Sequence, residues 1–243
     1  MSSLRVLVVA EGPSEIGDLD ALAGHKRRGN GREGYIPAML RKLLGADLQI
    51  DAQRVTRIGR WGRKPRLAGE GDRAAQAVLV AETLGCELLV FVRDVDREQG
   101  AKRNNVERRR KLRTMHDEID AGFEAAASTS VIPIKGTPCR MIEAWALGDR
   151  EALKAAGVDE RRLGGLPPWP EETWGREADP TSDHPKCILR RVFERHPSAS
   201  DFEQIARESR PDHLAKTCPD SFKPFLQEIG NAHERVRTRR RGP

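Results

Sequence analysis

The chain has 243 residues, of which 37% are hydrophobic and 33% are charged, and its formal net charge is +6. This length allows one large domain with a buried core, and the grouping of apolar residues in patterned blocks excludes a disordered chain. No apolar run approaches the roughly 20 residues that span a bilayer, and no signal-type segment is present. We therefore expect a cytoplasmic protein without a membrane partner, whose basic balance suits an anion such as nucleic acid.

Through residue 149, short apolar runs alternate with helical patterns, which is typical of βαβ units and a mainly parallel sheet. The apolar runs predict strands over residues 4–10, 48–55, 86–96 and 130–136. The helical patterns cover residues 35–45, 72–85, 104–126 and 139–149. The predicted fold class is therefore α/β, with a mainly parallel sheet flanked by helices.

The composition changes after residue 156, because residues 157–184 are rich in Pro, Gly, Trp and acids. Such a stretch predicts a linker or an irregular excursion. Helical patterns resume over residues 185–196, 201–209 and 221–236, with Ser200 as the predicted cap of the second, and a basic tail follows. We expect residues 1–156 to form the α/β domain, and residues 157–243 to form a linker and a helical C-terminal extension packed on it.

The cysteines, histidines and tryptophans form no recognisable motif. The four cysteines lack CxxC spacing and the histidines do not stand at metal-ligand spacing, so we expect neither a zinc site nor a disulfide framework. Reduced thiols are the simple interpretation. The tryptophans stand mostly near Gly and Pro, and we interpret them as packing anchors before base-stacking platforms. They are Trp61, Trp145, Trp169 and Trp174.

Acidic residues follow two of the predicted strands. Glu11 comes directly after the first, and Asp94 and Asp96 stand two positions apart at the end of the third. Residues two apart share a strand face, and parallel sheets bind ligands at their carboxyl edge, so neighbouring strands would bring these carboxylates together. Mg²⁺ is the usual hard cation for such oxygens in phosphate chemistry. The alternative is that the aspartates cap a turn and Glu11 is a solvated loop acid.

These residues resemble a known family. An apolar strand ending in a Glu-Gly turn with a further acid, "VVAEGPSE", and a later apolar strand ending in Asp-x-Asp, "VFVRDVD", are similar to the Toprim domain of topoisomerases, primases and OLD-type nucleases. The resemblance covers roughly the first 150 residues, a domain-sized piece. It implies a Toprim or Rossmann-like fold in which Glu11, Asp94 and Asp96 bind Mg²⁺ or Mn²⁺, with Glu15 and Glu98 as helpers.

The later sequence narrows this resemblance. "KGTPCRMIEAWALGD" and "DPTSDHPKCIL" are similar to segments of uncharacterised bacterial Toprim-like proteins, often encoded beside ATPases in phage-defence loci. The resemblance implies that Glu143 is a further metal ligand and that Lys135 reaches the anionic substrate. From the residues alone, Lys135 is equally an exposed strand-end lysine, and Glu143 points to water from a helix with an apolar face. The stretch "GDLDALAGHKRRGNGREG" departs from the family pattern by separating Glu15 from the next helix.

Two basic runs flank the same edge of the predicted sheet. One follows the Glu11 turn and the other follows the Asp94 strand, so both would overhang the carboxyl ends of the strands. Arginine suits phosphate through its planar fork, although most charge runs are only solvated helix faces. The predicted nucleic-acid-binding residues are Lys26, Arg27, Arg28, Arg108, Arg109 and Arg110.

Together these features predict a magnesium-dependent phosphodiester hydrolase, a nuclease acting on DNA or RNA, and the resemblance implies that it works in a prokaryotic anti-phage defence system. Glu11, Asp94, Asp96 and Lys135 are its predicted catalytic residues. The sequence has no GxxxxGK[ST] motif, so any ATP dependence requires a partner ATPase, and a homodimer is also compatible with the sequence. Two alternatives stay open: a non-catalytic Toprim-fold regulatory subunit of an ATPase complex, and a phosphatase that acts through an aspartyl phosphate.

Overall fold

A computed structural model of the chain describes residues 3–19, 31–45, 47–59, 67–95, 105–126, 128 and 130–241. At the centre of these residues lies a parallel sheet in the order β2-β1-β3-β4, formed by β1 (Leu4–Ala10), β2 (Leu48–Arg54), β3 (Leu88–Val92) and β4 (Ile132–Gly136). The predicted α/β fold class is confirmed. Because β1 and β3 are neighbours, their carboxyl ends lie side by side.

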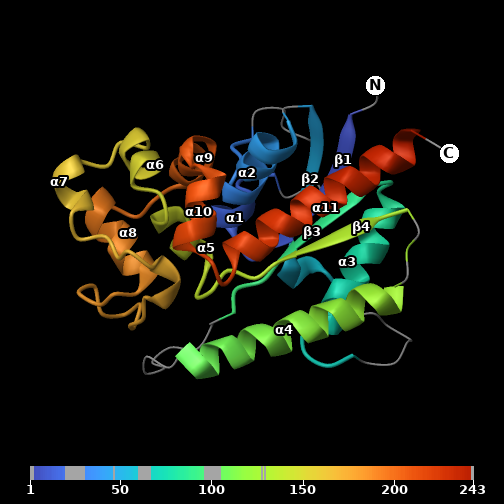
Figure 1. The fold of residues 1–243 in the computed structure, drawn as a ribbon, viewed down its shortest axis with the longest axis horizontal. Helices are drawn as coiled ribbons and strands as arrows, with labels where there is room; N and C mark the ends of the chain where they lie inside the picture. The colour runs from blue at the N-terminus through green and yellow to red at the C-terminus, as the bar shows by residue number, and fades with distance from the viewer. Residues whose placement is uncertain are drawn as a thin grey trace.

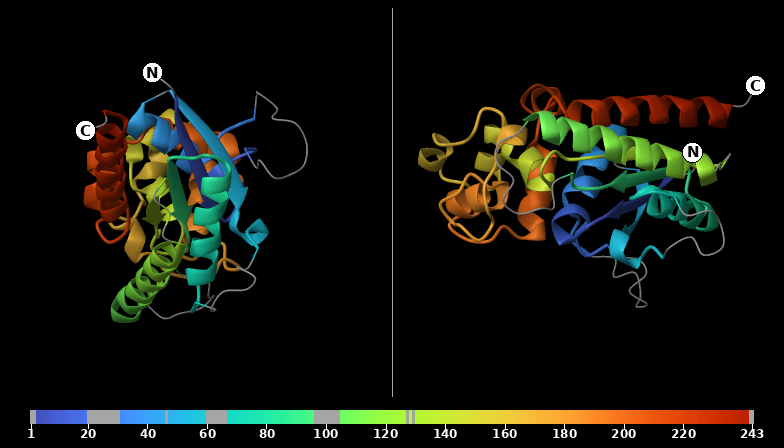
Figure 2. Two further views of the ribbon diagram at one scale, coloured as in Figure 1. Left: turned by 90° about the vertical axis from the view of Figure 1, so that its right-hand side faces the viewer. Right: turned by 90° about the horizontal axis from the view of Figure 1, so that it is seen from below.

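Helices cover both faces of the sheet (Figures 1 and 2). One face packs against α3 (Gly71–Thr83) and α4 (Asn105–Ala126), and the other against α1 (Pro13–Ile16), α2 (Tyr35–Leu44), α5 (Ile142–Leu147) and α11 (Phe222–Arg241). The β1 side chains alternate between these cores, since Val6 and Val8 join the second while Leu7 and Val9 join the first. This is the period-2 pattern of a strand buried on both faces. A 3₁₀ turn, η1 (Val55–Arg57), follows β2.

Beyond α5 the chain is helical and shares the core of the first half. It forms α6 (Arg150–Ala155), α7 (Glu160–Leu163), the 3₁₀ turn η2 (Pro170–Glu172), α8 (Pro185–Phe193), α9 (Ala199–Glu208), α10 (Pro211–Thr217) and α11. Apolar residues from both sides of residue 156 belong to one core, in which α9 packs on α2 and α11 packs on β4. The two halves of the chain therefore stabilise each other.

Three local predictions differ from the structure. The stretch 157–184, expected to be irregular, contains α7 and η2. α9 is capped by Ser198 and not by Ser200, because Ser198 and Asp201 form a capping box. The last helix runs beyond the predicted range into the basic tail and ends at Arg241, and Arg240 near its end pairs with Glu87 at 2.5 Å.

Trp145 joins α5 to α11. Its ring centroid lies 5.1 Å from that of Phe222 and 5.1 Å from that of Phe225, and its Nε1–H donates to Ser221 Oγ at 2.7 Å. A buried indole usually needs a partner for its N–H, and Ser221 supplies one. Trp145 is therefore a packing anchor, as predicted. Two other tryptophans contradict that prediction, because they are exposed (Trp169 and Trp174), and Trp61 lies outside the described residues.

The remaining sequence-level expectations concern thiols and membrane spans. All four cysteines are free and buried, as expected for reduced thiols without a disulfide framework. Within the described ranges, no helix combines the length and the apolar character that crossing a membrane requires.

The close approach of α3 and α4 depends on Gly122. A Cβ added there would lie 2.3 Å from the carbonyl oxygen of Gly71 and 2.8 Å from the Cβ of Ala74. We expect Gly122→Ala to lower the free energy of unfolding by about 1–3 kcal/mol, because the helices must separate. Gly230→Ala in α11 is the matched control, since nothing lies within 4 Å of its added Cβ, and it should raise stability by up to about 1 kcal/mol. Urea unfolding measures both, and equal changes would contradict the packing.

Candidate active site

Glu11 and Asp94 lie next to each other at the carboxyl edge of the sheet. Glu11 directly follows β1, and Asp94 lies two residues beyond the end of β3, its parallel neighbour. The backbone N–H of Asp94 donates to Glu11 Oε1 at 3.3 Å. The structure thus brings together two of the three acids that the sequence singles out. The third, Asp96, lies outside the described residues, as does the predicted helper Glu98.

The chain stays extended beyond the last residue of β3. The N–H of Arg93 donates to Gly136 O at 2.9 Å, and the N–H of Val95 donates to Pro138 O at 3.2 Å. Successive side chains of an extended segment alternate between faces, so Arg93 projects to one face and Asp94 to the other. This alternation separates the guanidinium from the carboxylate that follows it in the sequence.

The Asp94 carboxylate sits among other acids. Its Oδ1 is buried and has no hydrogen-bond partner among the described residues. Burial raises the pKa of Asp94 well above its ordinary value, and repulsion from Glu15, Glu11 and Glu143 raises it further. An acid held in this way gains stability from a proton or a cation.

Glu15 reaches the same region from α1. Its Oε2 accepts a hydrogen bond from the N–H of Gly12 at 2.7 Å, which satisfies the N-cap N–H at the turn after β1. The side chain is buried, and this burial raises the pKa of Glu15, with a further contribution from the nearby Glu11. Glu15 therefore both shapes the turn that carries Glu11 and adds negative charge beside it.

Glu143 is the buried acid of α5. It is only 7% exposed, and it lines a pocket of about 220 Å³ together with Lys186 and Glu177. Burial, followed by repulsion from Glu15, raises the pKa of Glu143 to about 7, although Lys186 acts in the opposite direction. The alternative in which Glu143 points from its helix into open water is wrong, because neighbouring elements cover it.

Lys186 is a charged residue of this region that the sequence reasoning missed. It is the second residue of α8, and its Nζ lies 3.4 Å from Glu177 Oε2. Burial works to lower the pKa of Lys186, but attraction by Glu143, Glu177 and Asp94 raises it overall. One feature of the sequence could have indicated its role. A cation in the first turn of a helix is unfavourable beside the positive end of the helix dipole, so an acidic neighbour is expected to stabilise it.

Arg93 is the second residue that the sequence reasoning missed. It is 0% exposed, and its Nη1 and Nη2 lie 2.9 Å from Glu11 Oε1 and 2.7 Å from Glu70 Oε1. A buried cation requires such partners, so an arginine that closes an otherwise apolar strand was the available signal. Part of the charge of Glu11 is therefore balanced by the protein itself.

The donor chemistry of this edge suits a hard divalent cation. All the donors are carboxylate oxygens, as Mg²⁺ prefers, and the buried Oδ1 of Asp94 lacks a partner among the described residues. Within the described ranges, however, no three or more His, Cys, Asp or Glu side chains form a group that could hold a metal ion. The predicted ligand set is incomplete there, since Asp96 is not among the described residues.

The predicted phosphate-binding residues lie in different surroundings. Arg110 has an exposed side chain, and it lines a pocket of about 450 Å³ with Asp94. Arg109 is exposed on the same helix, α4. Arg108 instead is buried and donates to the carbonyl oxygen of Glu171, so its side chain holds the fold and does not face a phosphate. Three predicted residues lie outside the described ranges: Lys26, Arg27 and Arg28.

The ion-pair partners of Lys135 are not among the acids that surround Asp94. Its Nζ pairs with Asp120 of α4 and lies 3.8 Å from Glu228 Oε1 of α11, on either side of β4 (Figure 1). The register sets Lys135 opposite Phe91, three residues before Asp94. Substrate binding by Lys135 stays a prediction, and it would require at least one of these ion pairs to open.

Comparison of the chain with models of protein families, with curated proteins and with solved structures finds no match. The resemblance to the Toprim domain is accordingly carried by the sequence motifs alone. The choice of a function therefore depends on the residues and the geometry described above.

The buried acids predict that stability falls as pH rises. The pKa of Glu143 is 4.5 in an ordinary environment and about 7 in the folded protein, so between these values the folded state keeps a proton that the unfolded state has lost. We expect Glu143→Gln to match the wild-type protein near pH 4. Near pH 8 in EDTA its free energy of unfolding should be higher by about 3 kcal/mol. Guanidinium unfolding at both pH values measures the difference.

The control for this prediction is Glu124→Gln, on the exposed face of α4. It should change stability by the same small amount at both pH values. If the stability gained by Glu143→Gln did not grow with pH, the raised pKa of Glu143 in the acidic site would be contradicted. Added Mg²⁺ should reduce the advantage near pH 8, because a bound cation stabilises the carboxylate of the wild-type protein.

Proposed function

We propose that this protein is a magnesium-dependent phosphodiester hydrolase, a nuclease that acts on DNA or RNA. The observation that carries the proposal is the position of Asp94 at the carboxyl edge of a parallel sheet. Its Oδ1 is buried and has no hydrogen-bond partner within the described part of the chain, and repulsion from Glu15, Glu11 and Glu143 acts on the carboxylate. This edge is where parallel sheets bind ligands, and clustered carboxylates there suit the metal that phosphate chemistry uses.

In this proposal Asp94 and Asp96 hold the metal, with Glu11, Glu15 and Glu143 as further ligands or as acids that shape its surroundings. Bound Mg²⁺ or Mn²⁺ supplies charge neutralisation at the phosphate and a more acidic water. Arg93 reduces the negative charge that Glu11 can contribute to metal binding, because the two side chains already form an ion pair at 2.9 Å.

The chain's own cations would position the nucleic acid. Arg110 and Lys111 of α4 line the same pocket of about 450 Å³ as Asp94. Glu70, Glu107 and Glu118 line it too, and Arg110 pairs with Glu107 at 2.8 Å, so these two cations would contact a phosphate once a bound metal offsets the carboxylates. Lys186 lines the pocket of about 220 Å³ with Glu143. A phosphate at Asp94 would thus have ammonium and guanidinium groups available in two pockets lined by these acids, which suits recognition of the backbone and not of the bases.

The cellular setting in this proposal rests on the resemblance alone. Bacterial Toprim-like proteins with similar segments are encoded beside ATPases in phage-defence loci, so we include a partner ATPase and a role in anti-phage defence. A homodimer remains part of the same proposal.

A second candidate is a non-catalytic subunit that keeps the fold and binds an ATPase or nucleic acid. Two observations favour it: the pairing of Glu11 with Arg93, and the lack of a three-ligand group within the described ranges. This candidate differs from the nuclease in one respect: it would bind nucleic acid without cleaving it in the presence of a metal ion. A phosphoryl-enzyme trapped at Asp94 would instead select the phosphatase alternative.

We expect Asp94→Asn and Asp96→Asn to reduce Mg²⁺-dependent cleavage of DNA or RNA by at least about a hundredfold, the loss typical of removing one group that stabilises the transition state. The melting temperature in EDTA should not fall for either variant, because the change removes repulsion between carboxylates. Asp117→Asn, at an exposed position of α4, is the control and should cleave normally. Unchanged cleavage by both site variants would refute the assignment, and absence of cleavage by the wild-type protein with retained binding would select the regulatory subunit.

Binding to nucleic acid should be driven by the backbone and weaken steeply with salt. We expect Arg110→Ala combined with Lys111→Ala to reduce the slope of log affinity against log salt by about 0.7–0.9 for each lost phosphate contact. Arg161→Ala, an exposed arginine of α7, is the control and should leave the slope unchanged. Fluorescence anisotropy with two unrelated oligonucleotides measures the slopes. A flat salt dependence, or strong preference for one oligonucleotide, counts against this interface.

A further inference from the structure

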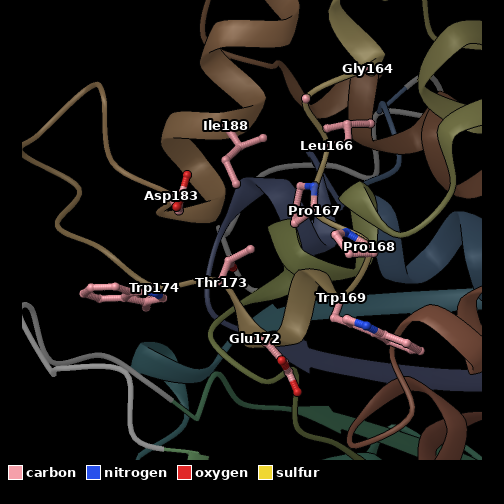
Figure 3. Close-up of a pocket in the computed structure, with 11 residues that line it drawn as sticks. Gly164, Leu166, Pro167, Pro168, Trp169, Glu172, Thr173, Trp174, Asp183 and Ile188 are labelled. Atoms are coloured by element: carbon pink, nitrogen blue, oxygen red, sulfur yellow. The ribbon is translucent and has the colours of Figure 1, made fainter.

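A separate groove lies at the end of the molecule formed by α7, α8 and η2, away from the two termini (Figures 1 and 3). Its volume is about 400 Å³. Trp169 and Trp174 line it and are 51% and 44% exposed, while the apolar Leu166 and Ile188 lining it are buried. The described acids of the candidate active site, Glu11, Glu15, Asp94 and Glu143, do not line this groove.

The turn that carries the two tryptophans is held by buried polar contacts. The Glu171 carboxylate accepts hydrogen bonds from the N–H groups of Asp220 and Ser221, each at 2.8 Å. On the other side of η2, Arg140 Nε donates to Thr173 O at 2.7 Å. The backbone is therefore fixed before any ligand binds, which lowers the entropy cost of binding. Large indole rings kept exposed on a fixed turn are typical of a recognition surface and not of a packing site.

The charges of the groove select its ligand. The described ionisable side chains that line it are those of Glu172 and Asp183, and no lysine or arginine is among the described lining residues. Asp183 Oδ1 lies 3.9 Å from Arg191 Nη2, but the Asp183 side chain is 72% exposed and can accept a second cation. Carboxylates repel phosphate groups, so the indole rings do not suit the stacking of nucleic-acid bases here. They suit a cation instead, because the face of a Trp ring attracts guanidinium and ammonium groups.

The positions of the rings indicate an elongated ligand. Figure 3 shows Trp169 and Trp174 on either side of Thr173, with their rings directed away from each other. They do not close around a single ammonium group, and the groove between them is lined by Pro167 and Pro168. We propose that this groove binds an extended, arginine-containing segment of a partner protein, whose guanidinium groups contact the indole faces and the carboxylates. This site is independent of the proposed nuclease activity.

The experiment uses the full chain and a capped peptide, Gly-Ala-Arg-Ala-Arg-Ala-Gly, together with an analogue in which citrulline replaces both arginines. Titration calorimetry should give saturable binding of the arginine peptide at one site, and binding of the neutral analogue should be at least about fivefold weaker. Trp169→Ala and Trp174→Ala should each weaken binding of the arginine peptide by about fivefold. Val106→Ala is the matched control, since this residue is 78% exposed on α4, outside the groove, and it should bind as the wild-type protein does.

A charge variant keeps the test independent of any effect of the tryptophan changes on folding. Asp183→Asn keeps both rings and should weaken binding of the arginine peptide while leaving binding of the citrulline analogue unchanged. Equal affinity for the two peptides, or no binding of the arginine peptide at millimolar concentration, would overturn the proposal. So would displacement of the peptide by oligothymidylate, because the groove would then bind nucleic acid.

Discussion

Mutual repulsion among acids at the carboxyl edge of one parallel sheet is the constraint on which the rest of this structure depends. The acids come from the ends of two neighbouring strands and from two helices: Glu11, Glu15, Asp94 and Glu143. Their burial and proximity hold protons on Asp94 and Glu143 at pH values where free acids are ionised. Arg93 pairs with Glu11, and Lys186 is attracted by Glu143 and Asp94, so both cations offset part of this charge. The charge that remains is what makes this edge suit a divalent cation.

The second half of the chain completes this edge. Glu143 and Lys186 both follow β4 in the sequence, and they come together because α8 packs on α5, which belongs to the core on one face of the sheet. The contact between Trp145 and Ser221 holds α5 against the start of α11, and α11 in turn packs on β4. A structural contact in the core and the electrostatics of the candidate active site are therefore coupled, because moving α5 would move Glu143.

Buried polar contacts also connect the candidate active site with the groove that contains Trp169 and Trp174. Arg108 of α4 donates to the carbonyl of Glu171, whose carboxylate binds the backbone that precedes α11. This contact fixes η2, so it sets the positions of the exposed tryptophans that follow and precede it. In the two proposals above, the acidic edge binds a metal ion and a phosphate backbone, whereas the aromatic groove binds a cationic segment.

The sequence by itself determined the parallel α/β fold, because the period of its apolar residues distinguishes buried strands from amphipathic helices. It also determined that Glu11 and Asp94 would lie at one edge, since both follow strands and parallel strands share their carboxyl end. Only the tertiary structure decided which cations meet these acids. Arg93 and Arg108 look alike in a charged sequence, yet one is buried against Glu11 and the other against Glu171. Ion pairs of this kind join residues far apart in the chain, so no local pattern of the sequence records them.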